Sequence, residues 1–368
     1  MGIADHLKRG LFRGLRLLDA PQVMAQVRFT GLRRRYYDSY WFRAAQELGA
    51  ESRRWDYGYH RLCRNGTVVI VRGPEVRLDD HLTLDLMGNK VLTYALMAEL
   101  GFAVPRHTRF SLTQMGLALD LLRATGRPLV VKPVAGTGGG RGVTTGITDA
   151  ASLRRAALSA SRFDPDLLAE EQIEGHSYRL LFLEGRLIDA IRRDPPRVTG
   201  DGLRSIRALV DAENRKRLKG APFTALSPLN LDRDALLYLA AQDLSPRSVP
   251  ARDEAVIVKR ACNENSHSEN HVVRNDVHPA TAAACSRLVR QLGVSFAGVD
   301  IIARDIARPL TPENGLIGEI NTTPGLHHHQ LVANPQDGPS VAAIVTEHLF
   351  QISSRAGGTG TLLHVAAE

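Results

Sequence analysis

One stretch of the chain, residues 129–142, constrains the fold and the chemistry more than any other. It reads LVVKPVAGTGGGRG, a short apolar segment broken by one lysine and followed by glycines. The apolar and β-branched residues predict a buried strand, in which the cation of Lys132 needs an anionic or hydrogen-bonding partner. Glycines let bare backbone N–H groups approach phosphate oxygens, so the stretch predicts a site for a nucleoside triphosphate. The residues expected to face the phosphates are Gly138, Gly139, Gly140 and Arg141.

The order of these residues differs from the two commonest phosphate-binding motifs. A Walker loop places its lysine after the glycines at the start of a helix, and a dinucleotide fingerprint also opens a helix with its glycines. Here the lysine comes first, and residues 143–147 (VTTGI) read as a second strand. We therefore expect the glycines at the tip of a hairpin that closes over phosphates. The alternative is a disordered glycine loop without a ligand.

Length and composition indicate a globular protein with acidic partners. A chain of 368 residues is long enough for about two to three domains. No apolar run is long enough to span a bilayer, and charges near the N-terminus break any secretory signal pattern. The three cysteines Cys63, Cys262 and Cys285 are odd in number and not closely paired, which favours a reducing cytoplasm and argues against a structural zinc. A net charge of +8 suits nucleotides, carboxylate substrates, acidic peptides or nucleic acid.

The first 105 residues are expected to form a basic amphipathic segment, 1–35, and a small α/β domain, 36–105. A helix expected at 3–18 has one apolar face, which we expect to dock on its own domain or on a dimer partner. A membrane surface or nucleic acid would also suit it. Aromatic residues interleaved with arginines resemble a stacking surface for nucleic acid, but packing of the small domain explains them more simply. They are Tyr36, Tyr37, Tyr40, Trp41, Trp55, Tyr57 and Tyr59.

A second lysine opens the helix expected from Met87 to Leu100, which Gly101 and Pro105 terminate. Lys90 lies in the first turn, where its charge adds to the positive end of the helix, so this placement favours a bound anion. We interpret Lys90 as a second phosphate-binding residue. A solvated surface lysine is the alternative.

Residues 167–175 (LLAEEQIEG) leave an apolar strand for a polar stretch that ends in glycine. Such a segment presents backbone groups and one carboxylate to the edge of a purine, while Ile173 covers the face of the ring.

Two basic segments are candidates for contacts with a reacting carboxylate. Arg192 and Arg193 lie in a turn-rich segment, and guanidinium groups bind carboxylates or acyl phosphates through two parallel hydrogen bonds. A solvated loop is the alternative. Lys259 and Arg260 end a strand expected at 256–260. The polar loop that follows, 262–271 (CNENSHSENH), carries more side-chain donors than a structural role requires.

Three oxygen donors converge on a pair of strands expected at 297–302 and 315–321. Glu319 and Asn321 are two residues apart and so point to one face, and Asp300 lies in the middle of the partner strand. Hard oxygen ligands that leave room for phosphate oxygens suit Mg²⁺, whereas a hydrogen-bonded structural cluster is the alternative. Three adjacent histidines at 327–329 cannot all face one ion, so we expect them to contact substrate or to lie in a solvated loop.

Taken in order, these motifs resemble those of the ATP-grasp superfamily, most closely the ATP-grasp part of cyanophycin synthetase and of the bifunctional glutathione-synthesising enzymes. The resemblance covers about residues 85–350 and is strengthened by TGDG at 199–202, GVD at 298–300 and EINTTPG at 319–325. It implies an α/β (α+β) ATP-grasp fold, with two subdomains that grip ATP. The expected parts are a lid at 106–166, a C-terminal subdomain with the metal site at 167–352 and a flexible tail at 353–368.

The resemblance also implies an activity, that of an ATP-dependent (ADP-forming) carboxylate-amine ligase that forms an acyl phosphate on an amino acid or peptide. If the roles of the family's motif residues apply to the matching residues here, Lys90, Lys132 and the glycine loop bind the phosphates of ATP. The implied adenine contacts are Glu170, Glu171 and Ile173, and the implied metal ligands are Asp300, Glu319 and Asn321, which would hold two Mg²⁺ ions with Mn²⁺ as a substitute. The residues that steady the acyl phosphate would be Arg192, Arg193, Lys259 and Arg260. We expect a cytoplasmic enzyme, a homodimer, without nucleic acid as a partner.

Two departures from the family pattern leave rival functions open. The sequence has no counterpart of the Mur-ligase-like second half of cyanophycin synthetase, so we do not expect it to carry out that two-step polymerisation alone. The loop after Asn263 also differs from the small, glycine-containing sequence of that family, which alters the surroundings of the acceptor. The rivals are a ligase or macrocyclase that modifies a precursor peptide, and a non-catalytic, basic nucleic-acid-binding protein on an ATP-grasp scaffold.

Overall fold

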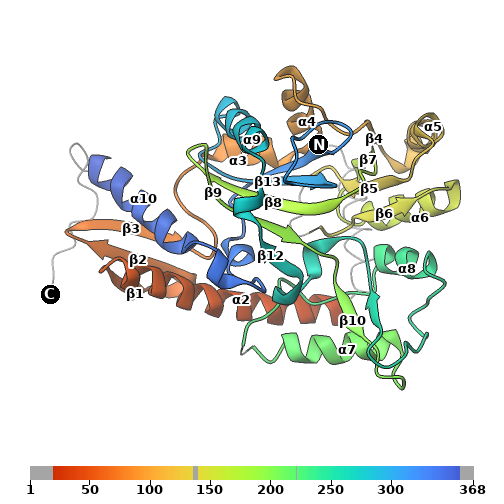
Figure 1. The fold of residues 1–368 in the computed structure, drawn as a ribbon, viewed down its shortest axis with the longest axis horizontal. Helices are drawn as coiled ribbons and strands as arrows, with labels where there is room; N and C mark the ends of the chain where they lie inside the picture. The colour runs from red at the N-terminus through yellow and green to blue at the C-terminus, as the bar shows by residue number, and fades with distance from the viewer. Residues whose placement is uncertain (1–19, 136–139, 221, 357–368) are drawn as a thin grey trace, which may run out of the picture.

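The computed structural model describes residues 20–135, 140–220 and 222–356, which form several small sheets with helices packed around them (Figure 1). The helix expected at 3–18 and the tail beyond residue 356 lie outside the described residues. No helix within the described part of the chain is long and apolar enough to cross a membrane.

The N-terminal part of the described chain is a long helix followed by a three-stranded antiparallel sheet of order β1-β2-β3. This helix runs through the expected boundary at residue 35. Tyr37, Tyr40 and Trp41 are buried in its core, as packing predicts, whereas Tyr57 is 81% exposed. The elements are α2 (Ala20–Glu47), β1 (Glu51–Arg54), β2 (Tyr59–Arg64) and β3 (Thr67–Arg72).

Two short helices, α3 (His81–Gly88) and α4 (Lys90–Glu99), replace the single helix expected from Met87. Asn89 separates them because its backbone is extended, and its side-chain oxygen accepts hydrogen bonds from the N–H groups of Val91 and Leu92. This cap satisfies two of the first N–H groups of α4. It fixes Lys90 as the first residue of the helix.

The lid is a four-stranded antiparallel sheet of order β4-β7-β5-β6, packed against two helices. Its core contains Leu129, Val131 and Ile147 from the strands and Leu153 from a helix. Because β7 pairs with both β4 and β5, the lid sheet extends beyond the expected boundary at 166. The elements are β4 (His107–Phe110), α5 (Met115–Thr125), β5 (Leu129–Pro133), β6 (Thr144–Ile147), α6 (Ala150–Ala160) and β7 (Leu167–Glu171).

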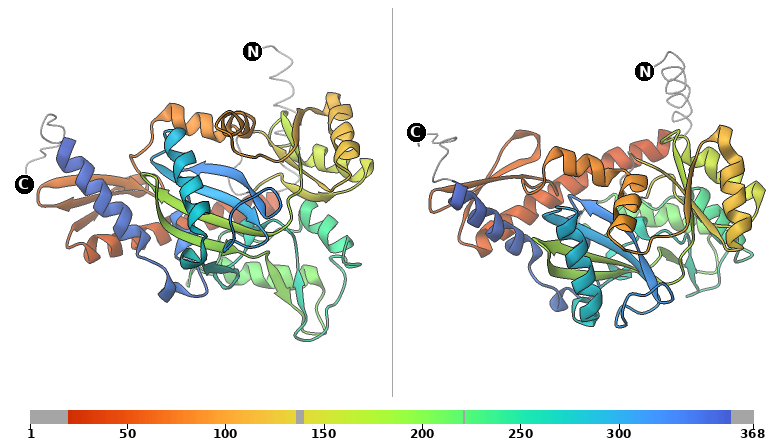
Figure 2. Two further views of the ribbon diagram at one scale, coloured as in Figure 1. Left: turned by 45° about the horizontal axis from the view of Figure 1, so that its top comes forward. Right: turned by 90° about the horizontal axis from the view of Figure 1, so that it is seen from above.

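The central sheet has five antiparallel strands in the order β12-β9-β8-β13-β14 and is covered on both faces (Figure 2). Alternation along β8 sends Leu180 and Phe182 into a core with α4 and α9, and Leu181 and Leu183 into a core with α2 and α10. The added elements are β8 (His176–Leu183), β9 (Arg186–Arg193), β12 (Asn270–Val272), α9 (Pro279–Gln291), β13 (Phe296–Ala303), β14 (Gly315–Thr322) and α10 (Val341–Ala356).

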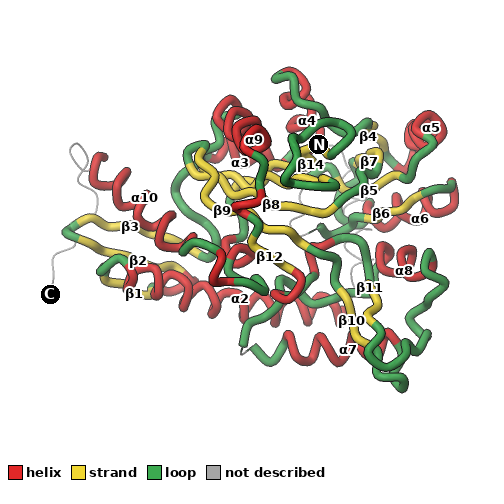
Figure 3. The backbone as a smooth tube through the Cα atoms, viewed as in Figure 1, coloured by secondary structure: helices red, strands yellow, loops and turns green. Residues whose placement is uncertain are grey.

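A smaller unit lies beside the lid and the central sheet (Figure 3). It has its own apolar core, which includes Ile206, Leu239 and Val258. The segment 222–244, which looks irregular in the sequence, contributes one of its helices. The elements are β10 (Arg197–Thr199), α7 (Ile206–Arg217), α8 (Arg233–Ala240) and β11 (Ala255–Ile257).

The turn between the lid and the central sheet gives a test of the fold. Gly175 has a φ of +140°, and a Cβ there would collide with the backbone of Ala303. We expect Gly175→Ala to lower the free energy of unfolding by roughly 1–3 kcal/mol, measured by denaturant titration. Gly31→Ala, in the middle of α2 with open space at its Cβ, is the control and should raise stability by about 0.5–1 kcal/mol. If Gly175→Ala and Gly31→Ala changed the free energy of unfolding equally, the predicted collision at residue 175 would be contradicted.

Candidate nucleotide and metal site

Lys132 lies on β5 with its ammonium group buried between the lid and α4. Its Nζ is 2.8 Å from Oε1 of Glu170 on β7 and 3.3 Å from the hydroxyl of Tyr94, and it is 8% exposed. Burial lowers the pKa of Lys132, but the neighbouring Glu170, Tyr94 and Glu319 raise it by more, so the ammonium stays charged. The anionic partner that the sequence requires is therefore Glu170.

Tyr94 is a residue of the site that the sequence analysis missed. Its hydroxyl lies 2.9 Å from Oε2 of Glu170 and 2.8 Å from the carbonyl oxygen of Gly318 on β14. Tyr94 follows Lys90 by one helical turn, so the signal available in the sequence was a tyrosine on the same face of α4 as a candidate ligand. The hydroxyl joins the lid to the strand that carries Glu319.

Lys90 contacts the carboxylate of Glu319 across the gap between α4 and β14. The Nζ–Oε1 distance is 3.4 Å, and the backbone N–H of Lys90 donates to the carbonyl of Val134 at 3.3 Å. The structure thus brings both candidate phosphate lysines to the region where the lid meets the central sheet. Each of them faces a carboxylate.

The three predicted metal ligands share one face of the central sheet. Asp300 on β13 is directly opposite Glu319, and Asn321 is opposite Gly298, so the pairing of the two strands brings the three residues together. The Nδ2 atom of Asn321 lies 3.3 Å from Oδ2 of Asp300. Among the described residues no group of three or more His, Cys, Asp or Glu side chains gathers as a metal site. Two carboxylates and an amide oxygen nevertheless fit Mg²⁺, which takes one or two protein carboxylates and completes its shell with water and phosphate.

Two arginines hold Asp300. Arg179 on β8 binds it through two hydrogen bonds of 2.6 and 2.7 Å, and Arg193 on β9 approaches at 3.2 Å. Burial raises the pKa of Asp300, but these guanidinium groups lower it by more, so the net pKa is below the ordinary range. Arg179 was missed in the sequence, although an arginine beside the buried residues 180–183 signals a charge that needs a partner.

Strand alternation separates the two arginines predicted at 192 and 193. Arg193 donates to Ser177 at 2.8 Å and belongs to the face that carries Asp300. Arg192 is on the opposite face, where it pairs with Asp194 at 3.0 Å. The structure therefore brings Arg193 to the site and leaves Arg192 outside it.

Lys259 and Arg260 follow β11 in the smaller unit. Lys259 is 1% exposed, and its Nζ is 2.7 Å from carboxylate oxygens of both Asp232 and Glu264. Burial lowers the pKa of Lys259, but the two carboxylates raise it by more, which favours a structural role for this cation. Arg260 is exposed and lies over the ring of Tyr238.

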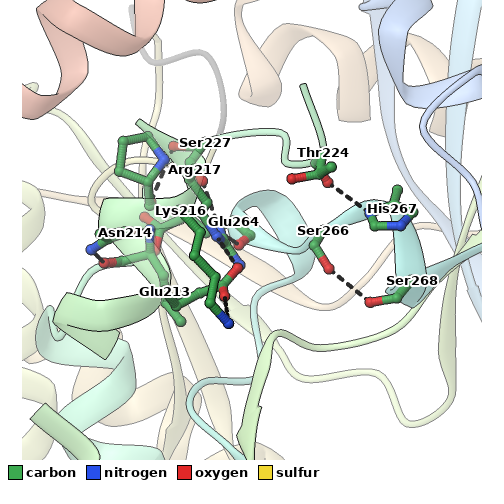
Figure 4. A network of polar contacts seen from close by, with 12 residues as sticks. Glu213, Asn214, Lys216, Arg217, Thr224, Ser227, Glu264, Ser266, His267 and Ser268 are labelled. Carbon is green, nitrogen blue, oxygen red and sulfur yellow. Dashed lines mark hydrogen bonds and ion pairs between the residues drawn. The ribbon is translucent and has the colours of Figure 1, made fainter. Parts of the chain in front are cut away.

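The polar loop 262–271 is built into the protein interior, which corrects the expectation that its donors exceed any structural need. Glu264, Asn265, Glu269 and Asn270 are all buried. Asn265 donates to the carbonyl of Asp194, Asn270 donates to that of Leu331, and Glu269 accepts from the N–H of Arg197. In Figure 4, Arg217 of α7 lies between Ser227 and Glu264, and it donates to both of their carbonyl groups. These side chains satisfy backbone groups that would otherwise be buried without partners.

The glycine hairpin lies beside this loop in space. Its residues 136–139, including Gly138 and Gly139, lie outside the described residues. Gly140 has a φ of +67°, and a Cβ there would lie 2.7 Å from the side chain of Asn263. Asp234 on α8 accepts from the N–H groups of Thr145 on β6 and of Ala261, so it joins the hairpin to the loop. Arg141 is exposed in the turn that leads into β6.

The remaining predicted adenine contacts follow Glu170 at the end of β7. Glu171 pairs with Arg127 at 2.8 Å, and its N–H donates to the carbonyl of Arg106. Ile173 is half-buried in the segment after the strand. Both carboxylate oxygens of Glu170 are engaged by Lys132 and Tyr94, so this carboxylate faces the lysine in the structure.

The three histidines at 327–329 do not form the solvated loop considered from the sequence. His327 and His329 are each 4% exposed; His327 contacts the hydroxyl of Tyr37 at 2.8 Å, and His329 contacts Asp189 at 2.7 Å. Burial and nearby cationic and histidine groups lower the pKa of His327 and His328, so these two rings are neutral. Through Tyr37, the helix α2 supports the segment that follows Asn321.

Comparison with known proteins agrees with this geometry. No protein-family model matches the chain. The chain is 30% identical over 276 residues, 73% of its length, to cyanophycin synthetase of Synechocystis sp.. It is 29% identical over 257 residues, 68% of its length, to the glutathione biosynthesis bifunctional protein GshAB of Mannheimia succiniciproducens. The matches cover 31% and 34% of those proteins, so the chain spans about a third of the length of these curated relatives.

Among solved structures, a bifunctional glutathione synthetase from Pasteurella multocida matches with a TM-score of 0.50 and 23% identity, covering 83% of this chain and 42% of that chain. This likeness concerns the fold. The fold and the sequence relationship together confirm the resemblance seen in the motifs, and the protein is an ATP-grasp protein. Within that superfamily it is homologous to the cyanophycin synthetases and to GshAB.

The adjacent residues Glu170 and Glu171 give a test of the buried ion pair between Glu170 and Lys132. Glu170→Gln leaves the buried ammonium of Lys132 without an anionic partner, so we expect the free energy of unfolding to fall by about 3–5 kcal/mol. Glu171→Gln is the control, because its partner Arg127 is 68% exposed and such a pair is worth about 0.2–1 kcal/mol. Denaturant titration of both variants checks this, and a loss at Glu171 as large as that at Glu170 would refute it.

The Asp300 cluster predicts a dependence of stability on acid. A carboxylate whose pKa is lower in the folded protein than in the unfolded chain stabilises the fold above its unfolded pKa of about 4, and this contribution is lost as the pH falls further. We expect the free energy of unfolding to decrease less steeply between about pH 4.5 and pH 2.5 in Asp300→Asn than in the unsubstituted protein. Denaturant titrations across this range would show it. If the free energy of unfolding fell equally steeply with pH in both proteins, the pairing of Asp300 with the arginines would be contradicted.

Proposed function

We propose that this protein is an ATP-dependent carboxylate-amine ligase that forms an amide or peptide bond through an acyl phosphate and releases ADP and phosphate. The observation that carries the proposal is the meeting of Lys90 and Lys132 with the face of the central sheet that holds Asp300 and Glu319. Phosphoryl transfer needs cations placed around the transferred group and a metal site beside them. The relationship to cyanophycin synthetases and GshAB supports this class of reaction.

The proposed reaction has two steps. An oxygen of the substrate carboxylate attacks the γ-phosphorus of ATP, the bond from that phosphorus to the bridging oxygen of ADP breaks, and an acyl phosphate forms. The neutral amine of the second substrate then attacks the acyl carbon, and inorganic phosphate leaves while the amine nitrogen loses a proton. Lys90 and Lys132 would hold phosphate oxygens through both steps, and Arg193 with Arg179 would steady the acyl phosphate.

Asp300, Glu319 and Asn321 would hold Mg²⁺, which neutralises charge on the phosphates when bound. We further propose two ions, with Mn²⁺ able to substitute. Glu171 and Ile173 would contribute to the adenine pocket, and the glycine hairpin with Arg141 would cover the phosphates. In the structure each lysine of the site pairs with a carboxylate and Asp300 pairs with two arginines, so a nucleotide and a cation entering together would exchange partners with these ion pairs.

The substrates we propose are an amino acid or peptide carrying the carboxylate and a second molecule carrying the amine. We place the enzyme in the cytoplasm, as a homodimer. We propose the domain plan expected from the sequence, with β7 added to the lid sheet and the boundary at residue 35 set aside because α2 spans it. A ligase or macrocyclase acting on a precursor peptide remains the second candidate, favoured by the basic character of the chain. A nucleic-acid-binding scaffold without catalysis fits poorly with two lysines that each pair with a carboxylate where the lid meets the central sheet.

One experiment tests the activity. The purified protein is incubated with Mg-ATP and pools of amino acids, dipeptides and acidic peptides, and ADP release and product mass are measured together. We expect substrate-dependent ADP and a product formed by loss of water, both reduced roughly 100-fold or more in Lys132→Ala and Glu319→Ala because each removes charge stabilisation of the transferred phosphoryl group.

Lys216→Ala is the matched control for that assay. Lys216 is 76% exposed at the end of α7, so its loss should leave both readouts unchanged. A condensed product from peptides alone would favour the precursor-peptide reading. Absence of nucleotide binding and of turnover in every pool would overturn the ligase proposal.

A further inference from the structure

We propose that Tyr94 is a positioning residue, which directs the Lys132 ammonium toward the phosphates and couples the lid to the strand that bears Glu319. This inference rests on the proposed function, because it assigns Lys132 to a phosphate. It concerns a residue that no motif in the sequence singled out, and it assigns that residue a role through its hydroxyl group alone.

The hydroxyl of Tyr94 stands at a junction of three groups from different parts of the chain. It accepts from Nζ of Lys132 on β5 at 3.3 Å, and it lies 2.9 Å from Oε2 of Glu170 on β7 and 2.8 Å from the carbonyl oxygen of Gly318 on β14. Tyr94 itself is 1% exposed, so water does not replace these contacts. A single side chain from α4 therefore contacts both subdomains at the point where they meet.

A hydroxyl has one proton to donate, and Tyr94 has two acceptors within reach. While Lys132 binds Glu170, that carboxylate is satisfied and the Tyr94 proton is free to bind the carbonyl of Gly318. If the ammonium turns toward a phosphate, Glu170 loses a donor in a buried place, which costs free energy unless another donor takes over. Tyr94 is that donor, because it is already 2.9 Å away. The hydroxyl thus lowers the cost of moving the Lys132 ammonium from carboxylate to phosphate.

The ring of Tyr94 has separate contacts, which a substitution can preserve. The Nζ of Lys132 is 5.4 Å from the ring centroid, and the ring of His107 is 5.0 Å away. Phenylalanine keeps the ring and these contacts and removes the hydroxyl only. Tyr94→Phe therefore isolates the proposed role from the packing role of the side chain.

The test measures the affinity of the full-length protein for MgADP and for adenosine by calorimetry. Adenosine has no phosphate, so a residue that acts through Lys132 affects MgADP alone. We expect Tyr94→Phe to bind MgADP about tenfold more weakly and adenosine with unchanged affinity, the size expected for one hydrogen bond to a charged group. A loss of the same size for both ligands indicates a merely structural role, and no loss for either rules out positioning; both outcomes would overturn the proposal.

Tyr178→Phe is the matched control. Tyr178 lies in the same apolar core as Tyr94, and its hydroxyl contacts the backbone of Ile306, away from Lys132. This variant removes a hydroxyl from that core and should bind both ligands as the unsubstituted protein does. A drop in MgADP affinity in Tyr178→Phe equal to that in Tyr94→Phe would also reject the specific role.

A double-mutant cycle with Lys132→Met decides whether Tyr94 acts through the lysine. If it does, adding Tyr94→Phe to Lys132→Met changes the MgADP affinity by less than about twofold, because the interaction is already lost. Additive losses would overturn the proposal. Should Tyr94→Phe not fold, Tyr94→Leu, which also lacks the hydroxyl, takes its place in the same cycle, with the same criterion. If the unsubstituted protein binds adenosine but not MgADP, the proposed function itself fails, which is distinct from a Tyr94 variant that binds normally.

Discussion

The buried ammonium of Lys132 is the constraint on which the rest of the site depends. A charge with so little exposure costs several kcal/mol unless partners surround it, and those partners come from three elements that are distant in the sequence. Glu170 arrives on β7, Tyr94 arrives on α4, and Tyr94 in turn reaches the backbone of β14 at Gly318. Satisfying one cation therefore fixes how the lid sheet, α4 and the central sheet lie relative to one another. The same contacts place Lys90 opposite Glu319.

The charged groups of the site are paired before any ligand enters, with one positive charge in excess. Lys132 faces Glu170, Lys90 faces Glu319, and Asp300 is held by Arg179 and Arg193. An anion alone would draw the lysines away and leave the carboxylates uncompensated, and a cation alone would do the reverse to the carboxylates. A ligand that brings both signs, such as the nucleotide and metal proposed above, would exchange partners with these ion pairs and leave fewer charges unpaired in the interior. The paired arrangement therefore favours the joint entry of the proposed nucleotide and metal.

The sequence predicted local features well and long-range partners poorly, for a physical reason. Strand alternation depends only on neighbouring residues, so the spacing predicted that Glu319 and Asn321 share one face, whereas the pairing of Glu319 with Asp300 is visible only in the folded chain. The sequence shows that a buried charge needs a partner, but it does not show which residue is that partner. Glu170 was assigned to adenine although it pairs with Lys132, and His329 finds Asp189, which is 140 residues away. Lys259 was assigned to catalysis because its two carboxylates, Asp232 and Glu264, are recognisable as partners only in the folded chain.

The loop 262–271 shows how one such hidden set of partners fixes a segment that lies next to the glycine hairpin. Its buried asparagines and glutamates hold the backbone at residues 194, 197 and 331, so its conformation is fixed by the fold. Gly140 of the hairpin packs against Asn263 of this loop, and Asp234 joins the two segments. A segment that is ordered before binding loses little conformational entropy when a ligand arrives. The loop is therefore fixed by the fold, whereas the ion pairs around Lys132 and Asp300 are the contacts that the proposed nucleotide and metal would exchange.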